Sequence, residues 1–167
     1  MKKLIILLIL LASVLFTAGC TEGPQKNSTD SQGIQEKNAV VEVTQLEQIN
    51  TSLQKGPVLV KLGAEWCTPC QEMKPILKEL ATEYEGKATI MSVDVDQSPK
   101  LADYFVVNSI PDSSVIVGID NGEYVYMQED GSVTKDRFKA RILGDMDKQV
   151  FVKVLDLALQ KENVKSK

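Results

Sequence analysis

Residues 58–84 read VLVKLGAEWCTPCQEMKPILKELATEY, and this stretch decides the fold. It opens with a mostly apolar run at 58–62, which is typical of a buried central strand. Apolar side chains then recur at helical spacing, and Gly86 follows them, so a helix is expected to end there. Two cysteines, Cys67 and Cys70, stand at the junction between the strand and the helix.

The cysteine pair has few possible partners in this chain. The sequence contains three cysteines and no histidine, whereas a structural zinc site needs four ligands that are usually Cys or His. No metal site is therefore expected, and the same composition excludes a nucleophile of the Cys–His type. A static disulfide is the structural alternative, although a two-residue spacer closes a loop too small to stabilise the fold much. The pattern favours reversible dithiol–disulfide chemistry.

The position of the pair predicts a different role for each sulfur. Cys67 precedes the first turn of the helix, where free N–H groups and the helix dipole favour an anion, so it is the expected nucleophile. Cys70 lies inside the helix and is the expected resolving thiol, which attacks the mixed disulfide on Cys67 and releases the reduced substrate. Thr68 and Pro69 form the spacer, and a proline suits this first turn. Trp66 is predicted to be partly exposed beside the site.

The rest of the chain supplies strands and helices in an order that indicates the fold class. Further strands are predicted at 40–43, 88–96, 113–119, 123–128 and 137–143, and further helices from a TQLE capping box at 44–47, at 98–105 and at about 147–160. Helices between the early strands and an antiparallel ending predict an α/β fold, with a central mixed β-sheet flanked by helices on both faces.

These motifs together resemble the thioredoxin family. The likeness runs from the opening stretch through VDVDQSPKLADYFVVNSIPD (93–112) to ILGDMDKQVFVKVLDLAL (142–159), and it predicts a thioredoxin-like domain at 39–165. The resemblance implies a thioredoxin fold and a protein-disulfide oxidoreductase. Its redox-active disulfide would join Cys67 and Cys70, with no other cofactor. Residues 120–136 are an insertion, which is either a partner surface or a longer hairpin, and DNG at 120–122 favours the hairpin.

The resemblance also assigns a role to the Ile-Pro dipeptide. It implies that the Ile110–Pro111 peptide bond is cis and faces the cysteines. The backbone of Ile110 would then pair with an extended segment of the substrate, as in strand addition. Pro111 would also keep metal ions away from the thiols.

Two positions depart from the family pattern. The family has a buried Asp where this chain has Lys61, and a cation there would favour thiolate and make the pair more oxidising. Alternatively, the Lys61 side chain snorkels to solvent, and Glu65 or a water relays protons. Asp112 stands where the family usually has Thr, and a carboxylate near Cys67 would have the opposite effect.

The N-terminal segment has the composition of an export signal. Lys2 and Lys3 precede LIILLILLASVLF, an apolar run too short to span a bilayer comfortably. FTAGC at 16–20 resembles a lipobox, which implies a lipoprotein signal peptide at 1–19 and a diacylglyceryl group on Cys20; an ordinary cleaved signal is the alternative. The polar stretch that follows predicts that 20–38 is a lipid anchor site and flexible tether.

The charge of the processed chain bears on its partners. Loss of Lys2 and Lys3 from 19 basic residues leaves 17, against 23 acidic ones, which disfavours nucleic-acid binding. We expect a protein anchored by lipid to the outer face of the cell membrane, or a secreted one if the signal is ordinary. Expected partners are exported proteins with disulfides or thiols, for example CxxCH apo-cytochromes c, and a membrane thiol carrier as electron donor. The alternatives are a disulfide oxidase or isomerase, and a non-catalytic binding or scaffold module.

Overall fold

The computed structural model describes residues 39–165. Its strands are β1 (Val41–Glu42), β2 (Val58–Gly63), β3 (Thr89–Asp94), β4 (Asp112–Asp120), β5 (Glu123–Met127), β6 (Val133–Thr134) and β7 (Ile142–Leu143). Its helices are α2 (Leu46–Leu53), α3 (Thr68–Glu83), α4 (Pro99–Tyr104) and α5 (Lys148–Lys165), with a short 3-10 helix, η1 (Arg137–Lys139).

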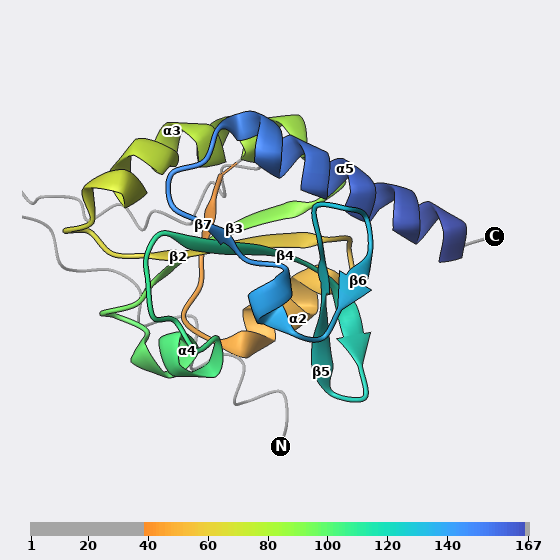
Figure 1. Ribbon diagram of the computed structural model, residues 1–167, viewed down its shortest axis with the longest axis horizontal. Coiled ribbons are helices and arrows are strands. Elements are labelled where there is room, and N and C mark those ends of the chain that lie inside the picture. Colours follow the sequence, from red (N-terminus) through yellow and green to blue (C-terminus); the bar gives the residue numbers. More distant parts are fainter. Residues whose placement is uncertain (1–38, 166–167) are drawn as a thin grey trace, which may run out of the picture. The chain divides into compact units, whose positions relative to one another are not determined.

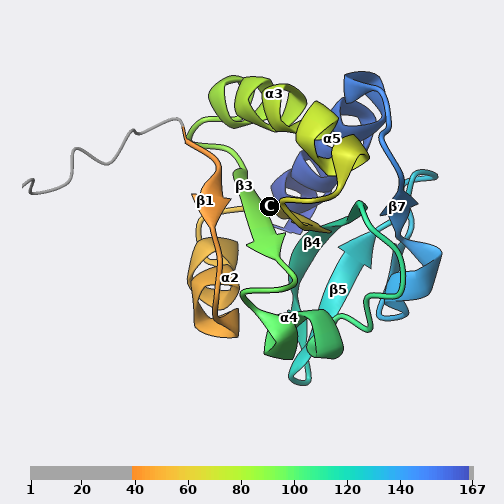
Figure 2. The same cartoon turned by 90° about the vertical axis from the view of Figure 1, so that its left-hand side faces the viewer.

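The strands form one mixed sheet between two layers of helices. The strand order is β1-β3-β2-β4-β5-β6, and β7 pairs with β4. Helices α3 and α5 cover one face of the sheet, and α2 and α4 cover the other (Figures 1 and 2). The predicted α/β fold with a central mixed sheet is therefore confirmed.

Strand β2 lies at the centre of the sheet and leads into the cysteine pair. It pairs in parallel with β3 and antiparallel with β4, and all six of its residues are buried. Successive side chains of a strand point to opposite faces. Leu59 accordingly packs in the core under α3 and α5, and Val60 packs in the core over α2 and α4. This two-sided burial explains the nearly continuous apolar sequence of β2.

The prediction of a last strand at 137–143 is wrong for most of these residues. Residues Arg137–Lys139 form η1, and the side chain of Asp136 caps it by accepting a hydrogen bond from the Phe138 amide at 3.1 Å. Only Ile142–Leu143 pair with β4. The side chain of Arg137 is turned inward to a buried carboxylate, and this contact replaces the alternating pattern of a strand.

The predicted capping box of the first helix is displaced by one residue. The N-cap of α2 is Gln45, whereas the sequence indicated Thr44. The Gln48 side-chain oxygen accepts hydrogen bonds from the backbone amides of Thr44 at 2.9 Å and Gln45 at 3.0 Å. The Gln48 side chain therefore has the role that the TQLE pattern assigned to Glu47, one residue earlier.

The insertion at 120–136 is built as a hairpin extension of the sheet. Strands β4 and β5 are joined by Asn121 and Gly122, whose φ angles of 52° and 81° are those of a tight hairpin turn. A second turn leads to β6, which pairs with β5. Of the two interpretations of the insertion, the hairpin therefore describes its structure.

The predictions for the N-terminus concern residues outside the described range. They are the signal peptide at 1–19, the lipidation of Cys20 and the tether at 20–38. Between residues 39 and 165, no helix has the length and apolar character needed to cross a membrane.

Three buried tyrosines predict a loss of stability at alkaline pH. Burial is the main cause that raises the pKa of Tyr84, Tyr124 and Tyr126 above the ordinary value of 10.0, and it raises that of Tyr126 to about 12. Because the unfolded chain releases these protons at lower pH, their contribution to stability is complete below pH 10. It is lost as the pH rises toward about 12.

We expect the urea midpoint to fall between pH 10 and about 12, together with a rise in tyrosinate absorbance. Tyr126→Phe removes one of these protons and serves as the matched variant, so its midpoint should fall less steeply over the same range. A midpoint that stays constant up to about pH 12 would contradict the prediction.

Candidate active site

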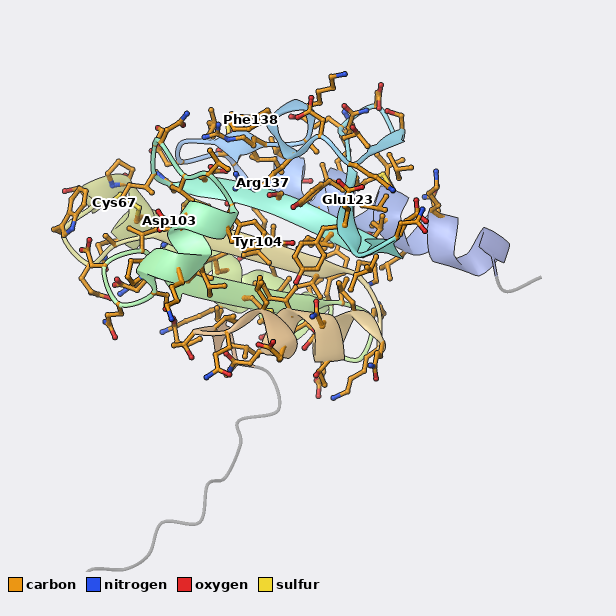
Figure 3. The ribbon with its side chains drawn as sticks, turned by 90° about the horizontal axis from the view of Figure 1, so that it is seen from below. Cys67, Asp103, Tyr104, Glu123, Arg137 and Phe138 are labelled. Carbon is orange, nitrogen blue, oxygen red and sulfur yellow. A yellow bond between two sulfur atoms is a disulfide. The ribbon has the colours of Figure 1, made fainter. Side chains whose placement is uncertain are left out.

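The cysteine pair lies at the N-terminus of α3 as a disulfide. Cys67 and Cys70 are bonded, with 5.2 Å between their Cα atoms, and Figure 3 places Cys67 at one end of the molecule. Cys67 is the N-cap of α3, and its Sγ accepts a hydrogen bond from the Cys70 amide at 3.2 Å. This amide and the helix dipole would stabilise a thiolate on Cys67 after reduction.

The exposure of the two sulfurs agrees with the predicted order of attack. Cys67 is 5% exposed, whereas Cys70 is completely buried beneath the helix start. An incoming disulfide therefore meets Cys67 first. The assignment of Cys67 as nucleophile and Cys70 as resolving thiol stays a prediction that these contacts support.

The residues around the disulfide form an exposed rim. Thr68 and Pro69 are exposed in the first turn, where the missing N–H of proline removes no helical hydrogen bond. Trp66 is 70% exposed, and its indole N–H donates to the carboxylate of Asp96 at 2.7 Å. This bond fixes the orientation of a large aromatic ring next to Cys67.

The Ile-Pro segment lies against the cysteine pair. The Ile110–Pro111 peptide bond is cis, as the resemblance implied. Pro111 is buried, and the half-buried Ile110 packs against the cluster that contains Cys67 and Cys70. The structure therefore brings together residues from two segments about 40 positions apart in the sequence.

Lys61 is buried behind the pair, near the inner sulfur. Its side chain is 4% exposed. A Cβ built on Gly63 would stand 2.4 Å from the Lys61 Nζ and 2.8 Å from the Cys70 Sγ. Nζ and Sγ are therefore no farther apart than the sum of these two distances. Burial is the main cause that lowers the pKa of Lys61, and the Glu42 carboxylate partly offsets it.

A pocket of about 340 Å³ lies beside Lys61 and Gly63. Its lining includes Lys61, Gly63, Gln71 and Lys74, together with the acidic residues Glu42, Glu65 and Asp94. Burial of the Lys61 side chain near the Cys70 sulfur agrees with the interpretation that places it beside the cysteines, and the same side chain also lines this pocket, which is open to solvent. Within residues 39–165, no group of three or more Cys, His, Asp or Glu side chains could hold a metal ion.

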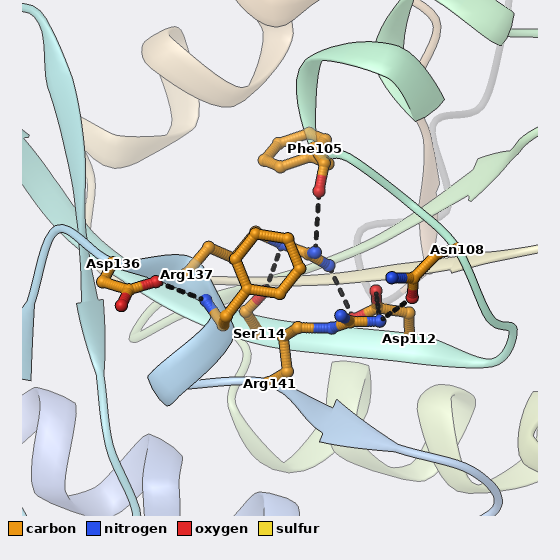
Figure 4. Close-up of polar contacts among 8 residues, drawn as sticks. Phe105, Asn108, Asp112, Ser114, Asp136, Arg137 and Arg141 are labelled. Atoms are coloured by element: carbon orange, nitrogen blue, oxygen red, sulfur yellow. Dashed lines mark hydrogen bonds and ion pairs between the residues drawn. The ribbon is translucent and has the colours of Figure 1, made fainter.

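Asp112 is fully buried and its charge is compensated. One carboxylate oxygen lies 2.6 Å from an Arg137 nitrogen, and the other lies 2.9 Å from an Arg141 nitrogen (Figure 4). Both arginine side chains are themselves only 7% exposed. The expected effect of Asp112 on Cys67 assumed a free carboxylate. Two guanidinium groups greatly weaken the field that this carboxylate can exert on the sulfur.

The two arginines also hold the backbone that precedes the cis proline. Arg137 donates to the Ser114 hydroxyl at 3.1 Å and to the Phe105 carbonyl at 2.9 Å, and Arg141 donates to the Asn108 side chain at 3.0 Å. Sequence reasoning missed this cluster. Its only signal was that the chain contains just two arginines, four residues apart, and an Asp beside a predicted buried strand.

Comparison with known proteins agrees with this geometry. The family model described as Thioredoxin matches residues 38–144. Thioredoxin from Staphylococcus aureus is 44% identical over 73 residues, which are 44% of this chain and 69% of that protein. Thioredoxin from Staphylococcus saprophyticus is 45% identical over the same shares.

Solved structures show the same fold. A thioredoxin mutant from Halobacterium salinarum has a TM-score of 0.55 at 21% identity, with 74% of this chain and 94% of that chain covered. Trichomonas vaginalis thioredoxin has a TM-score of 0.54 at 24% identity, with 69% and 94% covered. Fold, disulfide and matching family lead to one conclusion: this chain belongs to the thioredoxin family and is a thiol–disulfide oxidoreductase with a Cys67–Cys70 disulfide.

Proposed function

We propose that this protein is anchored by a lipid on Cys20 to the outer face of the cell membrane, where it reduces or exchanges disulfides of exported proteins. The observation that carries the proposal is the combination of a thioredoxin-family disulfide with the FTAGC motif behind an export-type segment. A tether at 20–38 would give the domain a reach of roughly 25 Å from the membrane.

The positions of the two sulfurs support the following reaction. The Cys67 thiolate attacks a substrate disulfide, one substrate sulfur leaves with the electron pair, and a mixed disulfide forms. Cys70 then attacks the Cys67 sulfur and expels the second substrate sulfur. The substrate gains two electrons and the protein keeps the Cys67–Cys70 disulfide. A membrane thiol carrier is proposed to reduce this disulfide again.

The substrate is proposed to lie across the apolar rim of the site. Trp66 offers an exposed ring next to the disulfide, Ile110 packs against the cysteines, and both residues line one open pocket. An extended segment that pairs with the Ile110 backbone would bring its cysteine to Cys67. This mode of binding uses the main chain, so it suits many exported proteins, including the CxxCH segments of apo-cytochromes c.

Oxidation of substrates is the second candidate function, and Lys61 favours it. Once Lys61 carries a proton, its ammonium group beside Cys70 stabilises thiolate and hence the reduced protein, whereas the opposing charge of Asp112 is compensated by arginines. The reduction potential against glutathione separates the two directions. A value near −270 mV, as in thioredoxin, supports a reductase, and one near about −120 mV supports an oxidase.

Membrane fractionation tests the anchor. The wild-type protein is expected in the membrane fraction, and Cys20→Ala is expected in the soluble fraction or the medium. Cys70→Ser is the matched control, because it removes a different sulfur and should stay with the membrane. Retention of Cys20→Ala on the membrane would overturn the lipid anchor.

Labelling of intact cells tests the side of the membrane. After mild reduction, a maleimide that does not cross membranes should label Cys67 in intact cells to the same extent as in lysed cells. Labelling that requires lysis would overturn the extracytoplasmic location.

A further inference from the structure

Lys61 places an amine near the sulfur of Cys70, which completes the reaction. Its Nζ and the Cys70 Sγ approach the same point beside Gly63, where glycine leaves room for both. A buried lysine is costly to keep charged, and burial is a common way to turn its amine into a base. We propose that Lys61 accepts the proton of the Cys70 thiol during resolution of the mixed disulfide and passes it to Glu42 at the mouth of the pocket.

The register of the sheet aligns the two groups of this relay. Glu42 in β1 stands opposite Ser92 in β3, and Ser92 stands opposite Lys61 in β2. Residues paired across strands project from the same face of a sheet, so the three side chains form one row. The row ends in the pocket that all three residues line.

Of the carboxylates that face Lys61, Glu42 is the one available to it. Asp94, on β3, accepts hydrogen bonds from the backbone amides of Asp96 and Gln97. Glu65, before α3, pairs with Lys74 at 2.9 Å. Among the residues that the structure describes, none forms a hydrogen bond or an ion pair with the carboxylate of Glu42.

The environment brings the two groups closer in proton affinity. Burial lowers the pKa of Lys61, and partial desolvation of the otherwise exposed Glu42 raises the pKa of Glu42; each is the largest single effect on its group. The charges that face Lys61 are Glu42 from β1, Asp94 from β3, and Glu65 and Lys74 from the segment around the start of α3. Lys74 lowers the pKa of Lys61, and the three carboxylates raise it.

The proposed step balances in atoms and electrons. Cys70 begins as a thiol, and its proton moves to the neutral Lys61 amine as its sulfur attacks the Cys67 sulfur. The Cys70–Cys67 bond forms, and the bond between Cys67 and the substrate breaks with its electron pair on the substrate sulfur. The new ammonium group releases the proton through Glu42 to solvent, and the substrate thiolate takes up a proton from solvent.

Single-turnover kinetics with a disulfide peptide test the relay. In Lys61→Met, we expect the mixed disulfide to accumulate, because its resolution should slow by about 10²-fold or more. The attack of Cys67, measured in a Cys70→Ser background, should keep its rate. Lys78→Met is the matched control, because it removes an exposed lysine of α3 that is not among the charges facing Lys61, and it should resolve at a rate near the wild type.

A second pair of variants tests whether Lys61 acts as a base or only as a fixed positive charge. Lys61→Arg keeps the positive charge but cannot lose its proton, so resolution should stay slow. Glu42→Gln removes a carboxylate that raises the pKa of Lys61, so the acid limb of the resolution rate should move to lower pH. Glu42 is exposed, and this variant therefore keeps the test available if a substitution at Lys61 prevents folding.

The relay rests on the proposed function, because it concerns the resolution of the mixed disulfide. The results of these experiments separate a failure of the relay from a failure of disulfide exchange. Resolution at wild-type rate in Lys61→Met or Lys61→Arg, or an unchanged pH profile in Glu42→Gln, would overturn the relay alone. Absence of any mixed disulfide on Cys67, in every variant, would instead overturn disulfide exchange itself.

Discussion

Cys67→Ser is expected to reduce the rate of insulin disulfide reduction to that of dithiothreitol alone. The serine hydroxyl cannot form a mixed disulfide, and Cys70 is completely buried and cannot replace the lost sulfur. The measurement is the turbidity of the released insulin B chain, followed with wild type and variant at equal concentration.

Cys70→Ser is the informative partner of this variant. It keeps the outer sulfur, which still accepts a hydrogen bond from the amide of residue 70, so the first attack should proceed and stop at the mixed disulfide. A covalent adduct of one substrate per protein is therefore expected on a non-reducing gel. If Cys67→Ser retained turnover, or if Cys70→Ser formed no adduct, the assigned roles of the two cysteines would be wrong. Equal background rates for all proteins would support the scaffold alternative.

Asp112→Asn is expected to lower the free energy of unfolding by about 3–5 kcal/mol. The change leaves the guanidinium groups of Arg137 and Arg141 buried without their counter-ion, and removing one partner of a buried ion pair has a cost of this size. Urea unfolding of the reduced and oxidised protein measures it. Asp120→Asn is the matched control, because its partner Lys135 is exposed, and its midpoint should stay nearly unchanged.

The same variant should also affect the reaction. Asp112 follows the cis proline directly, and the two arginines hold the Phe105 carbonyl and the Asn108 side chain in the segment before Ile110. We therefore expect a higher KM for a protein disulfide and little change for a small disulfide that needs no backbone pairing. A loss of stability below about 1 kcal/mol would place Asp112→Asn in the range of an exposed pair and contradict the prediction.

Most of the fold could be predicted from local sequence. The strand at 58–62, the helix after Cys70 and the hairpin turn at 120–122 each carry their pattern within a few residues, and the structure contains all three. The cysteine pair was equally readable, because its position at a helix start depends only on its neighbours.

The part that sequence could not predict depends on contacts between distant segments. The 137–143 segment has the composition of a strand, but Arg137 turns inward to a carboxylate 25 residues upstream. Lys61 left two interpretations open for the same reason. Only the pairing of β1, β3 and β2 brings Glu42 into its row, and only the missing side chain of Gly63 lets it reach the inner sulfur.

The cluster of Asp112, Arg137 and Arg141 limits how this domain can change by mutation. Replacing any one member leaves buried charge behind, whereas replacing all three with apolar residues of similar size would remove the charge together. Each single substitution gives a protein of reduced stability, whereas the triple variant can be as stable as the present protein. The three positions are therefore epistatic, and the segment 137–141, which carries both arginines, is expected to be transferable to a related domain only together with the aspartate.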